Sequence, residues 1–387
     1  MWQTIKNIYH LFQAIIAGVW YRFPSKKLKL IGVTGTDGKT TTTNLIYHIL
    51  HQNGYKVAML STVSAKIGDE DIDTGFHVTS PDRFLLNRLL VKMVNKNMEY
   101  AVLEATSHGL HQYRYFPLKF QISTVTNITH EHLDYHKTYE NYVKAKAILF
   151  NISQIAVLNQ DDNSYKLLRS FIKPIVQIVP YSYKLTKTYV SPLPGYYNQE
   201  NTLAAATVCE KLGLSQKQIQ SALKTFPGVV GRMDEISLGQ KFRVIVDFAH
   251  TPNALEQLLK TLRSQLKREG QLIVVFGAAG ERDYTKRPLM GKAASTYAHF
   301  SILTAEDPRS EKVDDITKSI VKGFKHPKQY HIEPDRGKAI KYALNIAKKD
   351  DIVVVTGKGH EKSMCFGKKE MPWSDKEEIV KNLSKIL

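Results

Sequence analysis

The sequence is poor in the residues that hold a small protein together without a large apolar core. Only two cysteines, Cys209 and Cys365, occur among 387 residues, and they lie far apart. This excludes a disulfide scaffold and a cysteine-rich zinc site, and it is typical of proteins from a reducing compartment. Hydrophobic residues make up 43% of the chain, so we expect a folded protein with a large core.

Acidic residues are also scarce relative to basic ones. The chain has 54 lysines and arginines against 36 aspartates and glutamates, a net charge of +18. Such a bias suits a phosphate-rich ligand, an anionic membrane surface or nucleic acid. The basic residues are scattered, and no zinc-finger or RNA-binding pattern occurs. We therefore expect no nucleic-acid partner.

The sequence lacks an apolar run long enough to span a bilayer, and no signal-peptide cleavage site follows its first segment. Near the N-terminus, apolar residues recur every three or four positions, which predicts a helix. Two interpretations are open: a helix docked on the protein's own body, or one lying at a membrane surface. The apolar stripe consists of Trp2, Ile5, Ile8, Phe12, Ile15, Val19 and Phe23.

Short apolar runs alternate with helical patterns along the rest of the chain, which predicts an α/β fold with mostly parallel sheets. A breaker cluster near residue 227 separates two such series, and we expect two α/β domains with a cleft between them. The predicted domains are an N-terminal helix and linker (1–26), a central domain (27–226) and a C-terminal domain (227–387). Strands are expected at 28–33, 57–60, 100–104, 122–127 and 155–159, then at 242–247, 272–276, 300–304 and 352–356, with helices at 40–50 and 139–150.

A glycine-rich turn between a predicted strand and a predicted helix indicates a phosphate-binding loop. Gly35 and Gly38 let the backbone N–H groups point at phosphate oxygens, and the helix N-terminus favours an anion. Lys39 is expected on the β- and γ-phosphates, and the Thr40 hydroxyl on Mg²⁺. The usual first glycine is Val33 here, so the loop is a variant. No guanine-specificity motif occurs, and the loop alone does not separate a kinase, a GTPase and a ligase.

Polar side chains follow the next two predicted strands. Glu104 ends one strand, beside the phosphate loop in the same sheet, where a carboxylate is suited to Mg²⁺. His130, His132 and His136 follow the next strand. Zinc is one interpretation of these histidines, but no cysteine accompanies them. We favour a role for His132 at magnesium or phosphate, and a packed or solvent-facing position for His130.

Together these motifs resemble the Mur ligase family, closest to its MurE-type UDP-N-acetylmuramoyl-tripeptide synthetases, from about residue 28 onward. The resemblance implies a P-loop-containing central domain, a mostly parallel sheet flanked by helices, and a Rossmann-like C-terminal α/β domain. It rests on these motifs: Gly35-Thr36-x-Gly38-Lys39-Thr40-Thr41, Glu104-x-x-Ser107-His108, Tyr142-x-x-Ala145-Lys146, Gly195-x-x-Asn198-x-x-Asn201, Gly231-Arg232-Met233, Asp247-Phe248-Ala249-His250, Lys286-Arg287-Pro288, Asp307-Pro308-Arg309 and Gly357-Lys358-Gly359-His360-Glu361.

The resemblance also implies roles for individual residues, with ATP as a substrate and Mg²⁺ as the metal. Lys39, Glu104, His132 and Lys146 match catalytic positions, and Lys146 matches a lysine that is carbamylated in the family. Thr40, Glu104 and His132 match metal ligands. ATP-binding positions are Gly35, Thr36, Gly38, Lys39, Thr40, Thr41, Asn198, Asn201, Arg232 and Asp247; acceptor-binding positions are Thr79, Ser80, Thr106, Gln112 and Arg114; amino-acid-binding positions are Arg287, Asp307, Arg309, Gly357 and Glu361.

The activity implied is ATP-dependent joining of an amino acid to UDP-N-acetylmuramoyl-L-Ala-D-Glu, or a similar muramoyl dipeptide, in cytoplasmic peptidoglycan synthesis. An acyl phosphate would be the intermediate. The phosphate loop comes earlier in the chain than the resemblance implies, so we expect the usual N-terminal UDP-binding domain to be missing. The terminal helix would then stand in its place, with peripheral contact at the inner face of the membrane as one interpretation.

The substrates stay open at this stage. Arg309 favours meso-diaminopimelate over lysine, because a guanidinium can bind a distal carboxylate in a bidentate manner. Asp307 replaces the family's asparagine and adds a negative charge. Two alternatives are a family relative acting on another carboxylate, as folylpolyglutamate and cyanophycin synthetases do, and an inactive nucleotide-binding scaffold. The presence of Lys39, Glu104 and Lys146 argues against the scaffold.

Overall fold

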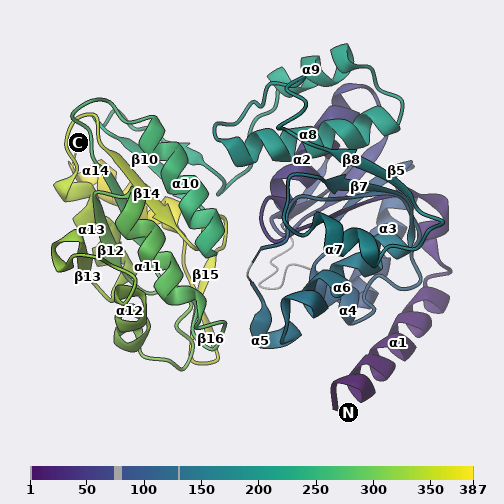
Figure 1. Cartoon of the computed structure of the whole chain (residues 1–387), viewed down its shortest axis with the longest axis horizontal. Helices are drawn as coiled ribbons and strands as arrows, with labels where there is room; N and C mark the ends of the chain where they lie inside the picture. Colours follow the sequence, from purple (N-terminus) through teal and green to yellow (C-terminus); the bar gives the residue numbers. More distant parts are fainter. Residues whose placement is uncertain (1, 74–80, 130, 387) are drawn as a thin grey trace. The chain divides into compact units, whose positions relative to one another are not determined.

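The computed structural model describes residues 2–73, 81–129 and 131–386, and the chain divides into two compact units, Met1–Pro227 and Gly228–Leu387. Each unit is an α/β layer structure with its own sheet and helices on both faces (Figure 1). The predicted fold class is confirmed.

The first unit is built on an eight-stranded sheet in the order β4-β3-β2-β5-β1-β6-β7-β8, in which β3 is antiparallel to both of its neighbours, β2 and β4, and the other neighbours are parallel. The strands are β1 (Lys29–Thr34), β2 (Val57–Leu60), β3 (Ser64–Ile67), β4 (Glu70–Asp73), β5 (Tyr100–Glu104), β6 (Phe120–Val125), β7 (Ser153–Asn159) and β8 (Gln177–Tyr181). Their buried aliphatic side chains pack on both faces, which is usual for a parallel sheet.

Helices of the first unit cover both faces of this sheet. In Figure 1, α2, α8 and α9 lie on one face, and α3, α6 and α7 on the other. The helices are α1 (Trp2–Trp20), η1 (Pro24–Lys27), α2 (Lys39–Gln52), α3 (Arg83–Asn95), α4 (Ser107–His111), α5 (Leu133–His136), α6 (Tyr139–Asn151), α7 (Tyr165–Ser170), α8 (Tyr196–Lys211) and α9 (Gln216–Lys224).

The second unit has a six-stranded sheet in the order β13-β12-β11-β14-β10-β9, parallel except for β9, and a separate hairpin of β15 and β16. Its strands are β9 (Asp234–Ile236), β10 (Arg243–Asp247), β11 (Leu272–Phe276), β12 (Phe300–Leu303), β13 (Tyr330–Ile332), β14 (Ile352–Thr356), β15 (Ser363–Phe366) and β16 (Lys369–Pro372). Its helices are α10 (Pro252–Ser264), α11 (Lys286–Tyr297), α12 (Val313–Val321), η2 (Pro327–Gln329), α13 (Arg336–Ile346) and α14 (Asp375–Ile386).

The expected helix at the N-terminus is present. Among its described residues, Phe12, Ile15 and Val19 of the predicted stripe are exposed, whereas Ala14 and Ala17 are fully buried. The interpretation of a helix docked on the protein's own body therefore holds for α1, but these three residues of the stripe do not form the contact. The helix contacts α3 through its small residues, because these allow close approach of two backbones.

Candidate active site

The phosphate loop connects β1 to α2, and its conformation depends on glycine. Gly38 is the N-cap of α2 with φ 80°, a backbone region that favours glycine. A Cβ atom there would also overlap the Asn201 side chain. The Lys39 ammonium group donates a hydrogen bond to the Thr36 carbonyl at 2.8 Å. No acidic residue lies in the first turn of α2, and the N-terminus of such a helix favours an anion.

Glu104 lies at the carboxyl end of β5. On the adjacent strand β1, it is paired with Val33. Its buried carboxylate accepts hydrogen bonds from the hydroxyls of Thr40 and Thr62, each at 2.9 Å. The Thr62 amide donates a third bond at 3.2 Å. A carboxylate and hydroxyls gathered at a phosphate loop are the oxygen donors that Mg²⁺ prefers, so these residues fit the metal.

The segment after β6 holds the phosphate loop from the other side. The Thr126 hydroxyl donates to the Asp37 carbonyl at 2.6 Å, and the Asn127 side-chain oxygen accepts from the Asp37 amide at 3.0 Å. The Thr36 amide donates to the Asn127 carbonyl at 2.8 Å. These bonds explain why β6 ends at Val125 rather than at residue 127 as predicted: the two following residues leave the ladder to bind the loop.

A cluster of imidazole and phenol rings lies beside the loop. His132 packs edge-on against His108, with ring centroids 4.8 Å apart, and lies 6.0 Å from the Tyr142 ring. The Tyr142 hydroxyl is 3.0 Å from the Thr36 hydroxyl and so links this cluster to the phosphate loop. Buried His136 contacts the Ser107 hydroxyl, and burial together with neighbouring positive charges lowers the pKa of His136 to about 3. Within the described ranges no three His, Cys, Asp or Glu side chains are grouped to hold a metal ion, so the zinc interpretation has no support there.

Lys146 lies on α6 and is almost completely buried. Its Nζ atom donates to the Gly35 carbonyl at 2.6 Å and lies 4.6 Å from the Tyr142 ring centroid. Burial, and secondly the positive charge of Lys39, lower the pKa of Lys146 well below its usual range. This environment favours the neutral form of the Lys146 amine more than an exposed position would.

Asn198 and Asn201 bring α8 to the same region. Both are buried, and the Asn201 amide donates to the Asn198 side-chain oxygen at 3.3 Å. The close approach of Asn201 to Gly38 places α8 against the loop. The structure thus brings Lys39, Thr40, Glu104, Lys146 and Asn201 together in the first unit.

Three of the expected acceptor residues lie around α4. The Thr106 hydroxyl caps α4 by accepting from the Gly109 amide at 3.1 Å. Arg114 donates to the Gln112 side-chain oxygen at 2.9 Å, and Gln112 in turn contacts the Tyr135 hydroxyl at 3.4 Å. Thr79 and Ser80 lie outside the described residues, as does His130.

The second unit carries the other expected ATP and amino-acid residues. Asp247 accepts backbone bonds from Met233 and Ala249, at 2.7 and 2.8 Å, and so fixes the turn around Arg232. The Arg232 guanidinium lies 4.3 Å from the centroid of the Phe248 ring. This stacking orients the arginine.

Asp307 and Arg309 differ sharply in their partners. Asp307 accepts from the Lys358 ammonium at 2.8 Å and from the Cys365 amide at 2.9 Å, and Lys358 also pairs with Glu361. In the part of the chain that the structure describes, the Arg309 guanidinium has no hydrogen-bond or ion-pair partner, and its Nε atom is buried. Lys358 therefore offsets part of the negative charge of Asp307 and Glu361, whereas Arg309 remains available to an anion.

Arg287 is already occupied. It forms a bidentate pair with Glu311, at 2.8 and 3.0 Å, and is itself buried. Gly357 has φ 108° and lies against the buried Glu306, where a Cβ atom would overlap the carboxylate. Arg287 thus orders the neighbouring loop, and of the expected amino-acid residues Arg309 is the better candidate for direct contact with a substrate carboxylate.

The comparisons with known proteins agree with this geometry. The chain matches the Mur ligase middle domain over residues 33–190 and the Mur ligase glutamate ligase domain over residues 231–359. It is 37% identical over 398 residues to a UDP-N-acetylmuramoyl-L-alanyl-D-glutamate--2,6-diaminopimelate ligase of Clostridium acetobutylicum, covering 96% of this chain and 82% of that protein. The corresponding Clostridium tetani ligase is 38% identical over 395 residues, with 96% and 80% covered.

This chain belongs to the Mur ligase family. Like the family, it is an ATP-dependent ligase that forms amide bonds and uses Mg²⁺. A solved UDP-N-acetylmuramoyl-L-alanyl-D-glutamate--2,6-diaminopimelate ligase has a TM-score of 0.62 and 31% identity to this Mur ligase, covering 95% of this chain and 81% of that one. A folylpolyglutamate synthase of Mycobacterium tuberculosis reaches a TM-score of 0.73 at 14% identity, covering 91% and 96%, which shows a shared fold only.

Sequence reasoning missed several residues of this Mur ligase that the structure places at the candidate site. Thr62 follows β2, the strand next to β5, so its position at a strand's carboxyl end was the available signal. Lys358 lies inside a recognised motif, but its pairing with Asp307 has no sequence signal. Arg336 and Asp375 form a fully buried bidentate pair, although they are far apart in sequence. Arg336 also donates hydrogen bonds to the carbonyls of Ala305 and Thr356.

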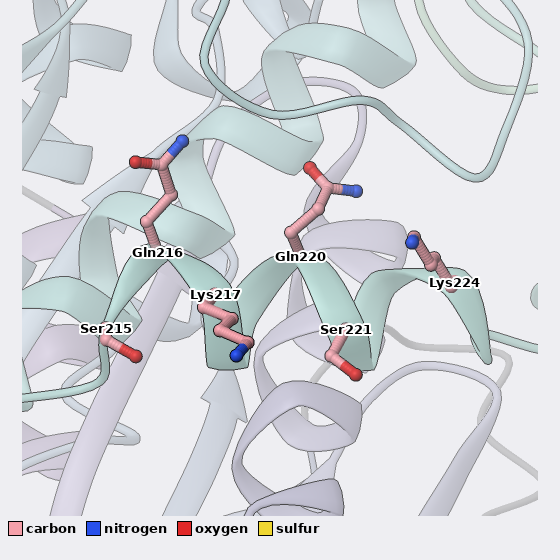
Figure 2. A pocket seen from close by; sticks show the side chains of 6 residues that line it. All are labelled: Ser215, Gln216, Lys217, Gln220, Ser221 and Lys224. Atoms are coloured by element: carbon pink, nitrogen blue, oxygen red, sulfur yellow. The ribbon is translucent and has the colours of Figure 1, made fainter.

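A shallow pocket on α9 is lined by polar side chains, shown in Figure 2, and none of them belongs to the expected site. It consists of Ser215, Gln216, Lys217, Gln220, Ser221 and Lys224. Across the described residues, no helix combines the length and the apolarity needed to cross a bilayer.

Proposed function

We propose that this Mur ligase adds meso-diaminopimelate to the glutamate carboxylate of UDP-N-acetylmuramoyl-L-Ala-D-Glu. The observation that carries the proposal is the Arg309 guanidinium, which has no polar partner among the described residues, beside an Asp307 carboxylate that Lys358 binds. A free guanidinium suits the distal carboxylate that diaminopimelate has and lysine lacks. Relatives more than one third identical over most of the chain are diaminopimelate ligases, which supports the same substrate.

The first chemical step is activation of the acceptor. A carboxylate oxygen of the acceptor attacks the γ-phosphorus of ATP, and the bond to the β-phosphate oxygen breaks, which yields an acyl phosphate and ADP. Lys39 and the N–H groups at the start of α2 would hold the phosphates and offset the charge that develops on them. Bound Mg²⁺ supplies further charge neutralisation, and Thr40, Glu104 and His132 are the residues proposed to hold it.

The second step is aminolysis. A free amine of the amino acid attacks the acyl carbon, inorganic phosphate leaves, and the amine gives up a proton to form the amide. Arg309 would hold the distal carboxylate, so that the attacking amine lies at a fixed distance from that charge. Lys358 and the Cys365 amide bind the Asp307 carboxylate, which weakens its competition for the guanidinium.

Lys146 is proposed to be carbamylated. Its neutral amine, favoured by burial, would attack CO₂, form a nitrogen–carbon bond and release one proton. The product is an anion in the place of a neutral amine, directly beneath the loop. It would attract the metal and the Lys39 ammonium.

The test is ADP release from purified protein with UDP-linked and lipid-linked muramoyl dipeptide, each with diaminopimelate or lysine. We expect release only when acceptor and amino acid are both present, with diaminopimelate preferred. Lys39→Ala should abolish release, and Lys56→Ala, at an exposed lysine of the same unit, should not. Wild-type turnover of the Lys39 variant would refute the mechanism. If neither diaminopimelate nor lysine supported ADP release, the proposed substrate would be refuted.

A further inference from the structure

Helix α1 presents several large apolar side chains to solvent. Among its residues with described side chains, Tyr9, Phe12, Ile16, Val19 and Trp20 are between 55% and 77% exposed. Their spacing of three and four residues places them on one side of the helix. Figure 1 shows α1 at the edge of the first unit. We refer to these five residues as the outer face of α1.

The opposite side of α1 is bound to the protein by small and polar groups. Ala14 and Ala17 are fully buried. The Gln13 side-chain oxygen accepts a hydrogen bond of 2.7 Å from Arg83 on α3, and Arg83 also donates to the Gln112 carbonyl at 2.8 Å. The helix is therefore attached with its apolar side outward, and turning that side inward would break these contacts.

The charged residues of the N-terminal segment have one sign. No aspartate or glutamate occurs before Asp37. Arg22, Lys26, Lys27 and Lys29 follow the helix directly and are exposed. Trp20, the most exposed residue of the outer face, lies at this same end. An apolar face ending in an aromatic residue and bordered by basic residues is typical of helices that lie in the headgroup region of anionic membranes.

We propose that α1 binds an anionic lipid surface, with its outer face in the acyl–headgroup boundary and the basic segment 22–29 on the lipid phosphates. A second copy of the chain fits the same face less well, because its own basic segment would add like charge to the contact. The basic segment attracts anionic lipid with a strength that falls as salt rises.

The proposal is tested by cosedimentation of the full chain with phosphatidylcholine vesicles with and without phosphatidylglycerol. We expect binding that requires phosphatidylglycerol and decreases with salt. Phe12→Ser combined with Trp20→Ser should weaken it at least tenfold, since two large apolar contacts are lost. Lys26→Gln combined with Lys27→Gln should weaken it by about fivefold per charge removed.

The matched control is Ile175→Ser combined with Leu185→Ser. These residues are 90% and 78% exposed in the same unit, outside α1, and their replacement should leave vesicle binding unchanged. All the substituted side chains are largely exposed, so the variants should keep the wild-type melting temperature and ATP affinity. Equal binding by wild type and the Phe12/Trp20 variant would overturn the proposal. So would a lipid-free dimer in sedimentation velocity that this variant dissociates, since a second copy would then cover the face.

Discussion

Replacement of Arg309 by alanine should change which amino acid the enzyme prefers. The substitution isolates the guanidinium, because the other bonds of this residue are made by its backbone: its amide donates to the Cys365 carbonyl at 3.0 Å, and its carbonyl accepts from Gly367 at 2.8 Å. Its φ of 53° is in the left-handed region, but alanine and arginine both carry a Cβ atom and are strained alike. The loop should therefore keep its shape.

The size of the effect follows from the bond that is lost. A hydrogen bond to a charged group contributes about 1.5–3 kcal/mol, and a bidentate pair lies toward the upper end. At about 1.36 kcal/mol per tenfold change, kcat/KM for diaminopimelate should fall by about tenfold to about 150-fold. Lysine has no distal carboxylate, so its kcat/KM should change little. Arg309→Lys should be intermediate, because an ammonium keeps the charge and loses the planar fork.

The assay is ADP release with both amino acids in competition, with product masses identifying which was added. Arg268→Ala, at an exposed arginine of the same unit, is the matched control and should keep wild-type selectivity. An unchanged ratio in the Arg309→Ala protein would refute the carboxylate-binding role. A fall of equal size for both amino acids would mean that Arg309 supports the fold of the loop and does not select the substrate.

Three other predictions follow from buried charged groups. After incubation with ¹³C-bicarbonate, NMR should show a carbamate resonance that Lys146→Gln lacks and Lys144→Gln, at an exposed neighbour, retains. Burial raises the pKa of Glu306 to about 7 from an ordinary 4.5, so the unfolding free energy should fall as pH rises through this window, because the native state binds the extra proton. In denaturant titrations, the unfolding free energy of the Glu306→Gln variant should not show this fall with rising pH. Arg336→Met should cost about 3–5 kcal/mol in the same titrations by leaving Asp375 buried and unpaired, more than Arg243→Met at a half-exposed pair.

The sheets of both units could be predicted from the sequence because each central strand is a continuous apolar run bounded by polar residues. The strands at 57–60, 100–104, 272–276 and 352–356 occur with these bounds. Strands that form an edge or a hairpin were not predicted. For example, β13 and β16 have half-buried or exposed side chains, so they lack the apolar pattern by which a buried strand is recognised.

Some residues of the candidate site could likewise be predicted from the sequence, and others could not. Lys39 and Glu104 could be found because each stands at a strand end or a helix start, positions that the sequence marks. The link from Glu104 to Thr62, and from Asp307 to Lys358, depends on loops that meet only in the folded chain. Motif spacing records which residues are present at the site, and it does not record which of them neutralise one another.

That distinction decides how the charged residues of the second unit should be interpreted. From the sequence alone, four charged residues are equally good candidates for binding the amino acid: Arg287, Asp307, Arg309 and Glu361. In the structure, Arg287 is bound by Glu311, and Lys358 is shared between Asp307 and Glu361. A charged side chain that is already paired contributes little to the binding of a ligand unless the pair is broken. Breaking a largely buried pair costs free energy. Arg309 is the member of this group that can accept a carboxylate without that cost. For this reason we assign substrate selection to it and structural support to the others.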